Sequence, residues 1–409
     1  MEGVLNRIFR SGTIGPLVLK NRVIMAPMGT EYADPDGYVT QRQIDYYAER
    51  ARGGVAMIMV EASSVQTSTS KSFMQPHLDD DRYIRMLSKL STAIQENGAR
   101  AAIQLQHAGA ASYEKVTGVT PMGPSSVSRR GFAQPREMTT RDIKEVRQCF
   151  VKAALRCREA GFEALGLHGA HQYLFAQFLS PMWNERSDEY GGSLENRARF
   201  LVEVVGAVKE SVPDLPLICR LTANEDGNIE FAGKRGIIFD ETLEVAKMIE
   251  RAGADALAVS SFGYGVRSTR QSPIVPGVLL HFAEAVKHEV SIPVTVAGGI
   301  TPWIAEAALD EGKADFVDIA RGFLADPFLV QKARSGHLED IVPCIACFLC
   351  TSEYVFMVPE SKGIRCSVNA RTGKESLYPY PLEKASKPKR VLVIGAGPGG
   401  MECARVCAL

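Results

Sequence analysis

Two histidines and a tyrosine are the first residues whose types and spacing could do chemistry. His168, His171 and Tyr173 stand at the end of an apolar stretch, residues 163–168, or directly after it. Imidazole N–H groups can donate hydrogen bonds to an oxygen on which negative charge develops, and a phenol can supply a proton. Any one of these residues alone would more often be structural. Their shared position makes them candidates for a catalytic set.

Polar donors also lie near the ends of other apolar stretches. Gln104 offers an amide and Arg220 a guanidinium group, while the pair Gly298 and Gly299 is followed one expected strand later by Arg321. In α/β barrels the loops after the seventh and eighth strands frequently bind a phosphate group. We therefore expect a phosphate site near Gly299 and Arg321.

Four of the nine cysteines lie within residues 344–366. Cys344, Cys347 and Cys350 recur at every third position, and Cys366 is available from a later turn. Thiolates at this spacing can bind successive corners of an iron–sulfur cluster, but four thiolates suit tetrahedral zinc equally well. The spacing alone leaves both groups open. The other cysteines are expected to pack as small apolar residues, and they are Cys149, Cys157, Cys219, Cys403 and Cys407.

A glycine-rich turn lies near the end of the sequence. The apolar residues 390–394 lead into Gly395, Gly397 and Gly400, a spacing typical of dinucleotide-binding domains when it follows a strand. A βαβ unit needs about 30 residues, so residues 391–409 are too few to hold FAD or NAD(P)H in this way. We expect the first strand, turn and helix of a Rossmann-like domain in a C-terminally truncated enzyme.

A repeating pattern of apolar stretches and amphipathic segments must position these residues. The pattern predicts an α/β protein with a (β/α)8 TIM barrel, because strand and helix alternate eight times. An open doubly wound sheet also alternates in this way and is the alternative. The strands are expected at residues 22–28, 55–62, 101–106, 163–168, 216–222, 255–261, 292–297 and 315–321.

Helix boundaries and domain boundaries follow from local signals. Thr139 and Asp240 are expected to cap the starts of their helices, and Gly161 and Gly253 to end them. Four helices are expected at residues 139–160, 193–211, 240–252 and 301–311. The expected units are a barrel at 1–335, a cysteine-containing module at 336–376, a linker at 377–388 and the start of a further domain at 389–409.

Composition and charge exclude several classes of protein. With 45% hydrophobic and 23% charged residues, the chain is neither disordered nor a coiled coil. Lys and Arg total 47, as do Asp and Glu, so there is no positive excess to bind nucleic acid or an anionic membrane. Neither a membrane-spanning run nor a signal peptide is recognisable, which predicts a cytoplasmic protein.

Several motifs resemble those of one enzyme family. The segment HGAHQYLFAQFLSPMWNERSDEYGGSLENR at residues 168–197 resembles the signature of the old yellow enzyme family of FMN-dependent ene-reductases, the NADH:flavin oxidoreductases. IMAPM at 24–28, IQLQHAG at 103–109 and ARGFLADP at 320–327 resemble its other landmarks. The resemblance covers roughly residues 5–335 and implies a barrel that binds FMN.

The resemblance assigns roles in an FMN site. Gln104 would pair with the pyrimidine edge of the flavin, and Arg220 would stabilise negative charge near N1 and O2. Where several relatives carry a side chain near flavin N5 this chain has Gly29, which leaves open whether Thr30 replaces it. The residues implied for FMN binding are Pro27, Met28, Ala62, Gln104, Arg220, Gly299, Ala320 and Arg321.

The same resemblance implies a mechanism. His168 and His171 would donate hydrogen bonds to a substrate carbonyl oxygen, which makes the β-carbon more electrophilic. Hydride would leave flavin N5, and Tyr173 would protonate the α-carbon from the opposite face.

The position of the cysteines directly after the barrel resembles the [4Fe-4S] module of larger relatives. These relatives include 2,4-dienoyl-CoA reductase, 2-enoate reductase and trimethylamine dehydrogenase. The resemblance implies that electrons pass from NAD(P)H through FAD and the cluster to FMN, with FAD and NAD(P)H bound only by the longer protein. Cys344, Cys347, Cys350 and Cys366 would hold the cluster.

The implied function is reduction of an activated C=C bond in an unsaturated acid, ketone or thioester. The alternatives are a steroid or bile-acid enone reductase, an amine dehydrogenase and a non-catalytic electron carrier. The expected partner is a small unsaturated carbonyl compound or an enoyl-CoA, and a homo-oligomer is compatible with the sequence. Four loop arginines could meet a carboxylate or CoA phosphates but are expected to be solvated, and they are Arg129, Arg130, Arg267 and Arg270.

Overall fold

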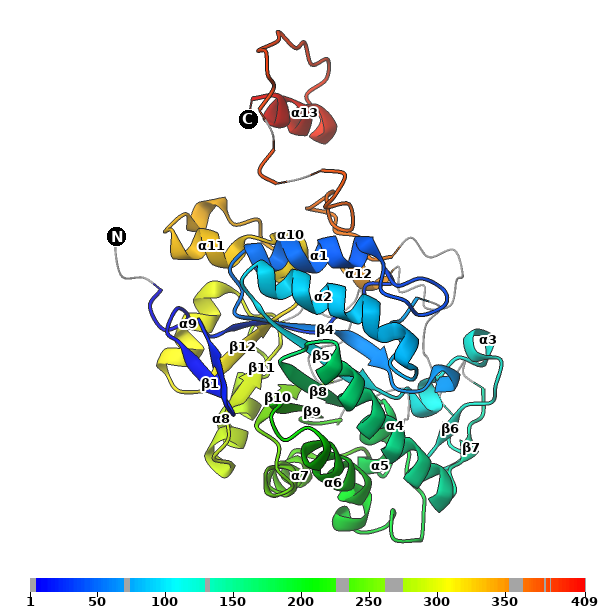
Figure 1. Ribbon diagram of the computed structural model, residues 1–409. Coiled ribbons are helices and arrows are strands. Elements are labelled where there is room, and N and C mark those ends of the chain that lie inside the picture. Colours follow the sequence, from blue (N-terminus) through cyan, green and yellow to red (C-terminus); the bar gives the residue numbers. More distant parts are fainter. Residues whose placement is uncertain are drawn as a thin grey trace.

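The barrel predicted from the alternating pattern is present and closed. The computed structural model describes residues 5–69, 74–128, 133–225, 235–261, 275–352, 363–378, 380–382 and 384–408. Eight parallel strands follow one another around the barrel in chain order (Figure 1). They are β3 (Val23–Met25), β4 (Met57–Ser64), β5 (Arg100–Gln106), β8 (Ala164–Gly169), β9 (Leu217–Thr222), β10 (Ala256–Ser260), β11 (Val294–Val296) and β12 (Phe316–Ile319).

Closure excludes the open doubly wound sheet. The last strand, β12, pairs with the first, β3, and Val317 lies opposite Val23. Each of the eight expected stretches overlaps one of the strands, and β4, β5 and β8 extend beyond their stretches by one or two residues. The prediction of a (β/α)8 barrel is therefore confirmed, and the carboxyl ends of all eight strands meet at one face, where barrel enzymes place their active sites.

Helices surround the barrel and their ends largely follow the expected signals. Thr139 caps α4 through a reciprocal hydrogen-bonding pair with Asp142, and Gly161 and Gly253 follow the ends of α4 and α7 with positive φ. Asp240 is not an N-cap, because α7 begins at Phe239 and Asp240 lies in its first turn. The outer helices are α1 (Gln41–Arg52), α2 (Ile84–Glu96), α4 (Thr140–Glu159), α6 (Leu194–Ser211), α7 (Phe239–Arg251), α8 (Leu280–Glu289), α9 (Pro302–Asp310), α10 (Arg321–Ala325) and α11 (Leu329–Arg334).

The apolar core has two parts. The larger part lies between the strands and the surrounding helices, and a smaller cluster fills the interior of the barrel. The hairpin of β1 (Gly12–Ile14) and β2 (Leu17–Leu19) contributes Ile14 and Leu19 to the interior cluster. Shorter elements are β6 (Met122–Gly123), β7 (Arg136–Glu137), α3 (Glu114–Thr117), α5 (Leu174–Leu179) and α12 (Leu349–Ser352). No helix in the described part of the chain is long and apolar enough to cross a lipid bilayer.

Residues 363–378, here named the strap, pack back onto the barrel. Arg50 of α1 forms a buried ion pair of 2.9 Å with Glu375, and the two side chains are 0% and 3% exposed. Glu49, the preceding residue of the helix, pairs with Arg371 at 2.6 Å. The strap crosses the expected boundary between the cysteine-containing module and the linker, and it is anchored to α1 by charge.

Hydrogen bonds extend this contact to the loop after β3. The hydroxyl of Tyr32 donates to the carbonyl oxygen of Ile364 at 2.7 Å, and the N–H of Ile364 donates to Thr30 O at 2.9 Å. Thr372 donates to Leu324 O at the end of the barrel. The strap, which itself carries Cys366, is therefore bound to the loop after β3 and to Leu324 of α10.

The last segment differs from its expected structure in one respect. The glycine-rich turn and a following helix, α13 (Pro398–Ala408), are present, and α13 lies apart from the barrel (Figure 1). Residues 390–394 are not hydrogen-bonded as a strand, and the side chains of Leu392 and Ile394 are 84% and 90% exposed. A strand needs a neighbour to satisfy its backbone groups, and these residues have none in the described part of the chain.

Candidate functional site

The two histidines and the tyrosine come together at the carboxyl end of β8. His168 is the penultimate residue of this strand, and Tyr173 precedes α5. The His168 ring lies 5.0 Å from the His171 ring and 4.7 Å from the Tyr173 ring, both measured between centroids. His171 has a φ of 58°, so the chain turns through a left-handed conformation that few residues adopt. This turn folds the three rings into one group.

Ser260 at the end of β10 connects this group to Arg220. The hydroxyl oxygen of Ser260 lies 2.7 Å from His171 Nε2, and Arg220 Nη2 donates to the same oxygen at 3.2 Å. Arg220 is 7% exposed, and its burial lowers the pKa of the guanidinium group while Asp318 acts in the opposite direction. The chain of contacts thus runs from a buried cation through a hydroxyl to an imidazole.

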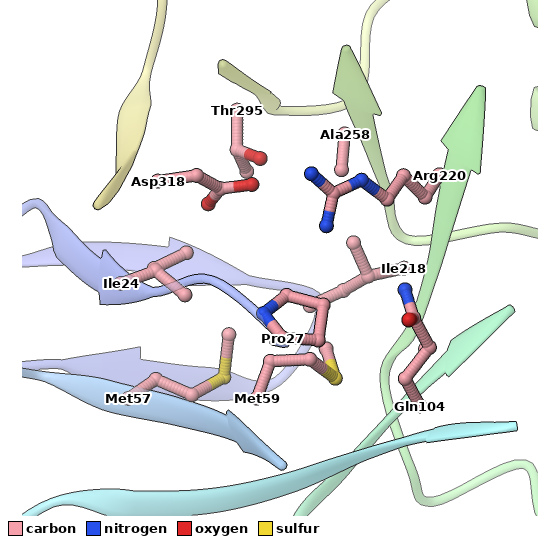
Figure 2. A pocket seen from close by; sticks show the side chains of 11 residues that line it. Ile24, Pro27, Met57, Met59, Gln104, Ile218, Arg220, Ala258, Thr295 and Asp318 are labelled. Carbon is pink, nitrogen blue, oxygen red and sulfur yellow. The ribbon is translucent and has the colours of Figure 1, made fainter. Parts of the chain in front are cut away.

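Gln104 and Arg220 face a cavity inside the barrel (Figure 2). Pro27 also lines it, and Asp318 on β12 stands across from Arg220. Gln104 is 3% exposed, and Arg220 Nε is buried without a hydrogen-bond partner among the described residues. Burial of a guanidinium N–H without an acceptor is costly in free energy. This N–H is therefore available to an acceptor group of a ligand.

The loop after β3 is held by a buried carboxylate. The N–H of Thr30 donates to Glu61 Oε2 at 2.7 Å and its hydroxyl donates to Glu61 Oε1, while Gln43 donates to the same oxygen at 2.6 Å. The Thr30 side chain is fully buried. Its hydroxyl is therefore engaged in holding the loop in place, which speaks against Thr30 as the replacement for a side chain at Gly29.

Pro27, Met28 and Ala62 lie at the ends of two neighbouring strands. Pro27 and Met28 belong to the loop after β3, Ala62 lies in β4 next to Glu61, and all three are half-buried. Partly exposed side chains at two adjacent strand ends could cover one side of a flat ring.

The expected phosphate residues lie at the ends of β11 and β12. Gly299 has a φ of 72°, and Arg321 begins α10 directly after Ala320. Arg321 Nη1 is buried and has no hydrogen-bond partner in the part of the chain that the structure describes. A cation at this position, beside a glycine turn, fits an anionic group such as a phosphate.

The four cysteines line a second hollow. Cys344, Cys347, Cys350 and Cys366 all face it, together with Arg321. Burial raises the pKa of Cys350 to about 11, and Arg321 acts in the opposite direction. The structure thus brings the expected set together although Cys366 is distant in sequence.

The cysteines are not placed like the ligands of one metal ion. Among the described residues, no group of three or more His, Cys, Asp or Glu side chains is arranged to hold a metal ion. Ala346 and Phe348, which flank Cys347, have φ values of 52° and 58°. The chain therefore turns through a left-handed conformation on both sides of Cys347.

Comparison with known proteins identifies the family. The NADH:flavin oxidoreductase / NADH oxidase family, which is the old yellow enzyme family, matches residues 7–340. The chain belongs to this family. It is therefore a flavin-dependent oxidoreductase, and the cofactor of the family is FMN.

Two relatives of this flavin oxidoreductase extend over nearly the whole chain. NADH oxidase of Thermoanaerobacter brockii is 40% identical, with 98% of this chain and 61% of that protein covered. Cinnamate reductase of Clostridium sporogenes is 31% identical, with 97% of this chain and 62% of that protein covered. The chain thus spans about three fifths of the length of these curated relatives.

Solved structures of similar proteins include both reductases and dehydrogenases. A 2-naphthoyl-CoA reductase in complex with 2-naphthoyl-CoA has a TM-score of 0.91 at 33% identity, covering 98% of this chain and 62% of that chain. Histamine dehydrogenase from Rhizobium sp. 4-9 has a TM-score of 0.88 at 30% identity, covering 98% of this chain and 58% of that chain. The same fold thus occurs in a protein named as a reductase and in one named as a dehydrogenase.

Some residues of the flavin oxidoreductase were not recognised from its sequence. Ser260 is the last residue of β10 and Asp318 lies within β12, and no sequence motif assigned a role to either of them. Glu61 follows an apolar run, which is a signal that could have been used. The four loop arginines, Arg129, Arg130, Arg267 and Arg270, lie outside the described residues.

The glycine-rich turn has a clear steric reason for one of its glycines. A Cβ atom on Gly400 would lie 1.8 Å from the carbonyl oxygen of Gly395. Gly395 itself has a φ of 107°, and Gly397 has open space around it. Glycines at 395 and 400 let the helix pack directly on the turn, as in a dinucleotide-binding motif.

Proposed function

We propose that the chain is the FMN-binding part of a longer ene-reductase, which reduces a C=C bond conjugated to a carbonyl group. The observation that carries the proposal is the assembly of His168, His171 and Tyr173 at the strand ends beside Arg220. The names of the cinnamate and 2-naphthoyl-CoA reductases support this reaction class.

The residues of the barrel fit FMN. When bound, FMN supplies the hydride that reduces the double bond. The buried Arg220 offers an N–H without a partner in the described chain, and Gln104 offers both a donor and an acceptor to the ring. Gly299, Ala320 and Arg321 would hold the phosphate, and Pro27, Met28 and Ala62 would line the ring.

The three rings have separate tasks in this proposal. His168 and His171 donate hydrogen bonds to the carbonyl oxygen and stabilise the negative charge that develops on it. Tyr173 then gives its phenolic proton to the α-carbon. The product gains one hydride and one proton across the double bond, and water later restores the proton on Tyr173.

An amine dehydrogenase is the second candidate, because histamine dehydrogenase has a similar structure. An alkylammonium substrate needs a carboxylate or an aromatic cage. The contacts of His171 lead instead to Ser260 and the buried cation Arg220, which would repel an ammonium group. The electrostatics of this site therefore favour a substrate whose oxygen becomes negative.

The test of the proposal is replacement of the proton donor. Tyr173→Phe is expected to slow re-oxidation of the reduced flavin by a cyclic enone by at least roughly a hundredfold and to leave flavin content unchanged. Tyr38→Phe, which alters a tyrosine that packs on Tyr83, is the matched control. Equal re-oxidation rates for Tyr173→Phe and the parent chain, or turnover of amines and not of enones, would overturn the proposal.

We further propose that the cysteine hollow holds a [4Fe-4S] cluster. Each thiolate of such a cluster binds a different iron atom, so its ligands stand further apart than those of one zinc ion. The lining of one hollow by Cys344, Cys347, Cys350 and Cys366, shortly after the barrel in sequence, supports a cluster site there. Anaerobically purified protein is expected to contain about four iron atoms per chain, and zinc without iron would contradict the cluster.

In the longer enzyme, we propose that NAD(P)H and FAD deliver electrons through this cluster. The turn at Gly395, Gly397 and Gly400 with its following helix supports a dinucleotide site there. The non-catalytic electron carrier is less well supported, because a carrier needs no proton donor such as Tyr173.

A further inference from the structure

Two polar side chains inside the barrel have no role in the site as described so far. Thr295 of β11 and Asp318 of β12 line the same cavity as Gln104 and Arg220. Thr295 is 1% exposed and Asp318 is 6% exposed. Burying a carboxylate is costly unless other groups bind it, so an interior strand position would ordinarily carry an apolar residue.

Asp318 is oriented towards the cavity and away from the outer helices. Figure 2 shows its carboxylate and the Thr295 hydroxyl on one side of the cavity, with the Arg220 guanidinium group opposite. Burial raises the pKa of Asp318, and the positive charge of Arg220 opposes this shift. The cavity therefore has an acceptor wall and a donor wall, with space between them.

The position of the pair along the barrel indicates which part of a flavin it meets. Gln104 and Arg220, the expected ring contacts, lie on β5 and β9. Thr295 and Asp318 lie on β11 and β12, a few residues before Gly299 and Ala320 at the expected phosphate site. The pair thus shares a cavity with the expected ring contacts and lies on the two strands that lead to the expected phosphate site. The ribityl chain of FMN, with its hydroxyl groups, connects the ring to the phosphate.

We propose that Asp318 and Thr295 bind the ribityl chain of FMN, with the Asp318 carboxylate accepting hydrogen bonds from its hydroxyl groups. A carboxylate has two oxygens that can each accept, and a threonine hydroxyl can both donate and accept, which suits a polyol. The inference rests on the proposed flavin site and adds to it the residues that recognise the part between ring and phosphate.

The experiment compares flavins that differ in the side chain. The full chain, freed of flavin, is titrated with FMN, riboflavin and lumiflavin, and binding is followed by flavin fluorescence. Riboflavin lacks the phosphate of FMN, and lumiflavin lacks the ribityl chain as well. Comparing FMN with riboflavin therefore isolates the phosphate, and comparing riboflavin with lumiflavin isolates the ribityl chain. The variants are Asp318→Ala, Asp318→Asn and Thr295→Val, and Met57→Leu is the control for an apolar change in the same cavity.

Asp318→Ala is expected to weaken FMN and riboflavin binding roughly tenfold or more and to leave lumiflavin binding unchanged, since hydrogen bonds to a charged group are lost. Asp318→Asn keeps one acceptor oxygen and is expected to lose less. Met57→Leu is expected to change the three affinities by similar factors.

Two results would overturn the inference. One is an equal loss for lumiflavin and riboflavin in Asp318→Ala, which would place the effect at the ring through Arg220. The other is unchanged binding of all three flavins in a variant whose unfolding temperature shows that it is folded. Failure of the parent chain to bind FMN at all would instead contradict the flavin site itself.

Discussion

At the scale of single residues, Ser260 determines how His171 is held. Its oxygen is shared between His171 Nε2 and the Arg220 guanidinium group. Because arginine can only donate, the hydroxyl must accept from Arg220 and keeps its own proton available for the imidazole. When Ser260 donates this proton to His171 Nε2, Nδ1–H is the imidazole group that donates to a substrate.

Replacing Ser260 by alanine is expected to slow enone reduction. The loss of a hydrogen bond to a charged group costs about 1.5 kcal/mol, which corresponds to roughly a tenfold lower rate of flavin re-oxidation. Ser261→Ala is the matched control, since the Ser261 hydroxyl donates to the backbone oxygen of Asn224 instead. A rate in Ser260→Ala equal to that of the control would show that Ser260 does not position His171.

His107 gives a prediction on pH and stability. It is fully buried, and desolvation lowers its pKa to about 3 while Nδ1 accepts from the N–H of Gly109. The unfolded chain, with a pKa near 6.5, binds one more proton between pH 6.5 and 3. The contribution of a neutral, buried His107 to the free energy of unfolding is therefore complete above pH 6.5. It falls as the pH is lowered below this value, by roughly 1.4 kcal/mol per pH unit.

His107→Asn is expected to remove this part of the acid sensitivity, because the amide oxygen can accept from Gly109 without taking up a proton. Chemical denaturation at pH 7 and pH 5 measures the effect. A parent chain and a variant with the same pH slope would contradict the assignment.

At the scale of elements, the strap is the contact that joins the cysteine hollow to the barrel. The pair formed by Arg50 and Glu375 is buried on both sides, and Arg50 also stacks 3.5 Å above the Tyr46 ring. Removal of one partner leaves a buried charge without compensation, whereas exposed pairs contribute little.

Glu375→Gln is therefore expected to lower the free energy of unfolding by about 3 kcal/mol. The control is Glu145→Gln, which breaks the exposed pair of Glu145 with Arg141 and is expected to cost less than about 0.5 kcal/mol. Equal destabilisation of the two variants in urea would show that the strap is not held by this ion pair. Reduced iron content in Glu375→Gln would indicate that strap docking also supports the cysteine hollow.

At the scale of the whole molecule, the order of electron transfer can be tested by comparing chain lengths. Dithionite is expected to reduce the flavin of this chain readily, whereas NADH is expected to do so at least roughly tenfold more slowly than in a chain of the length of its curated relatives. The observation behind this prediction is that the chain covers 61% of one such relative and 62% of another. Equally fast reduction by NADH in both chains would show that hydride enters directly at the barrel.

The sequence by itself determined the features that depend on local pattern. The alternation of apolar stretches and amphipathic segments placed all eight strands, and Gly161 and Gly253 ended their helices because glycine adopts positive φ without cost. The strand ends at His168 and Arg220 were predictable, since parallel strands in a barrel present their carboxyl ends at one face. Local signals were weaker at Asp240, which could cap a helix or occupy its first turn.

Only the tertiary structure decided which distant residues face one another. Ser260 meets His171 and Arg220 across three strands, Asp318 faces Arg220 across the barrel interior, and Glu375 reaches Arg50. These contacts depend on barrel closure and strand register, which no short stretch of sequence encodes. The strand expected at residues 390–394 also depends on distant residues. Its apolar pattern is typical of a strand, but the hydrogen bonds of a strand come from a neighbouring strand.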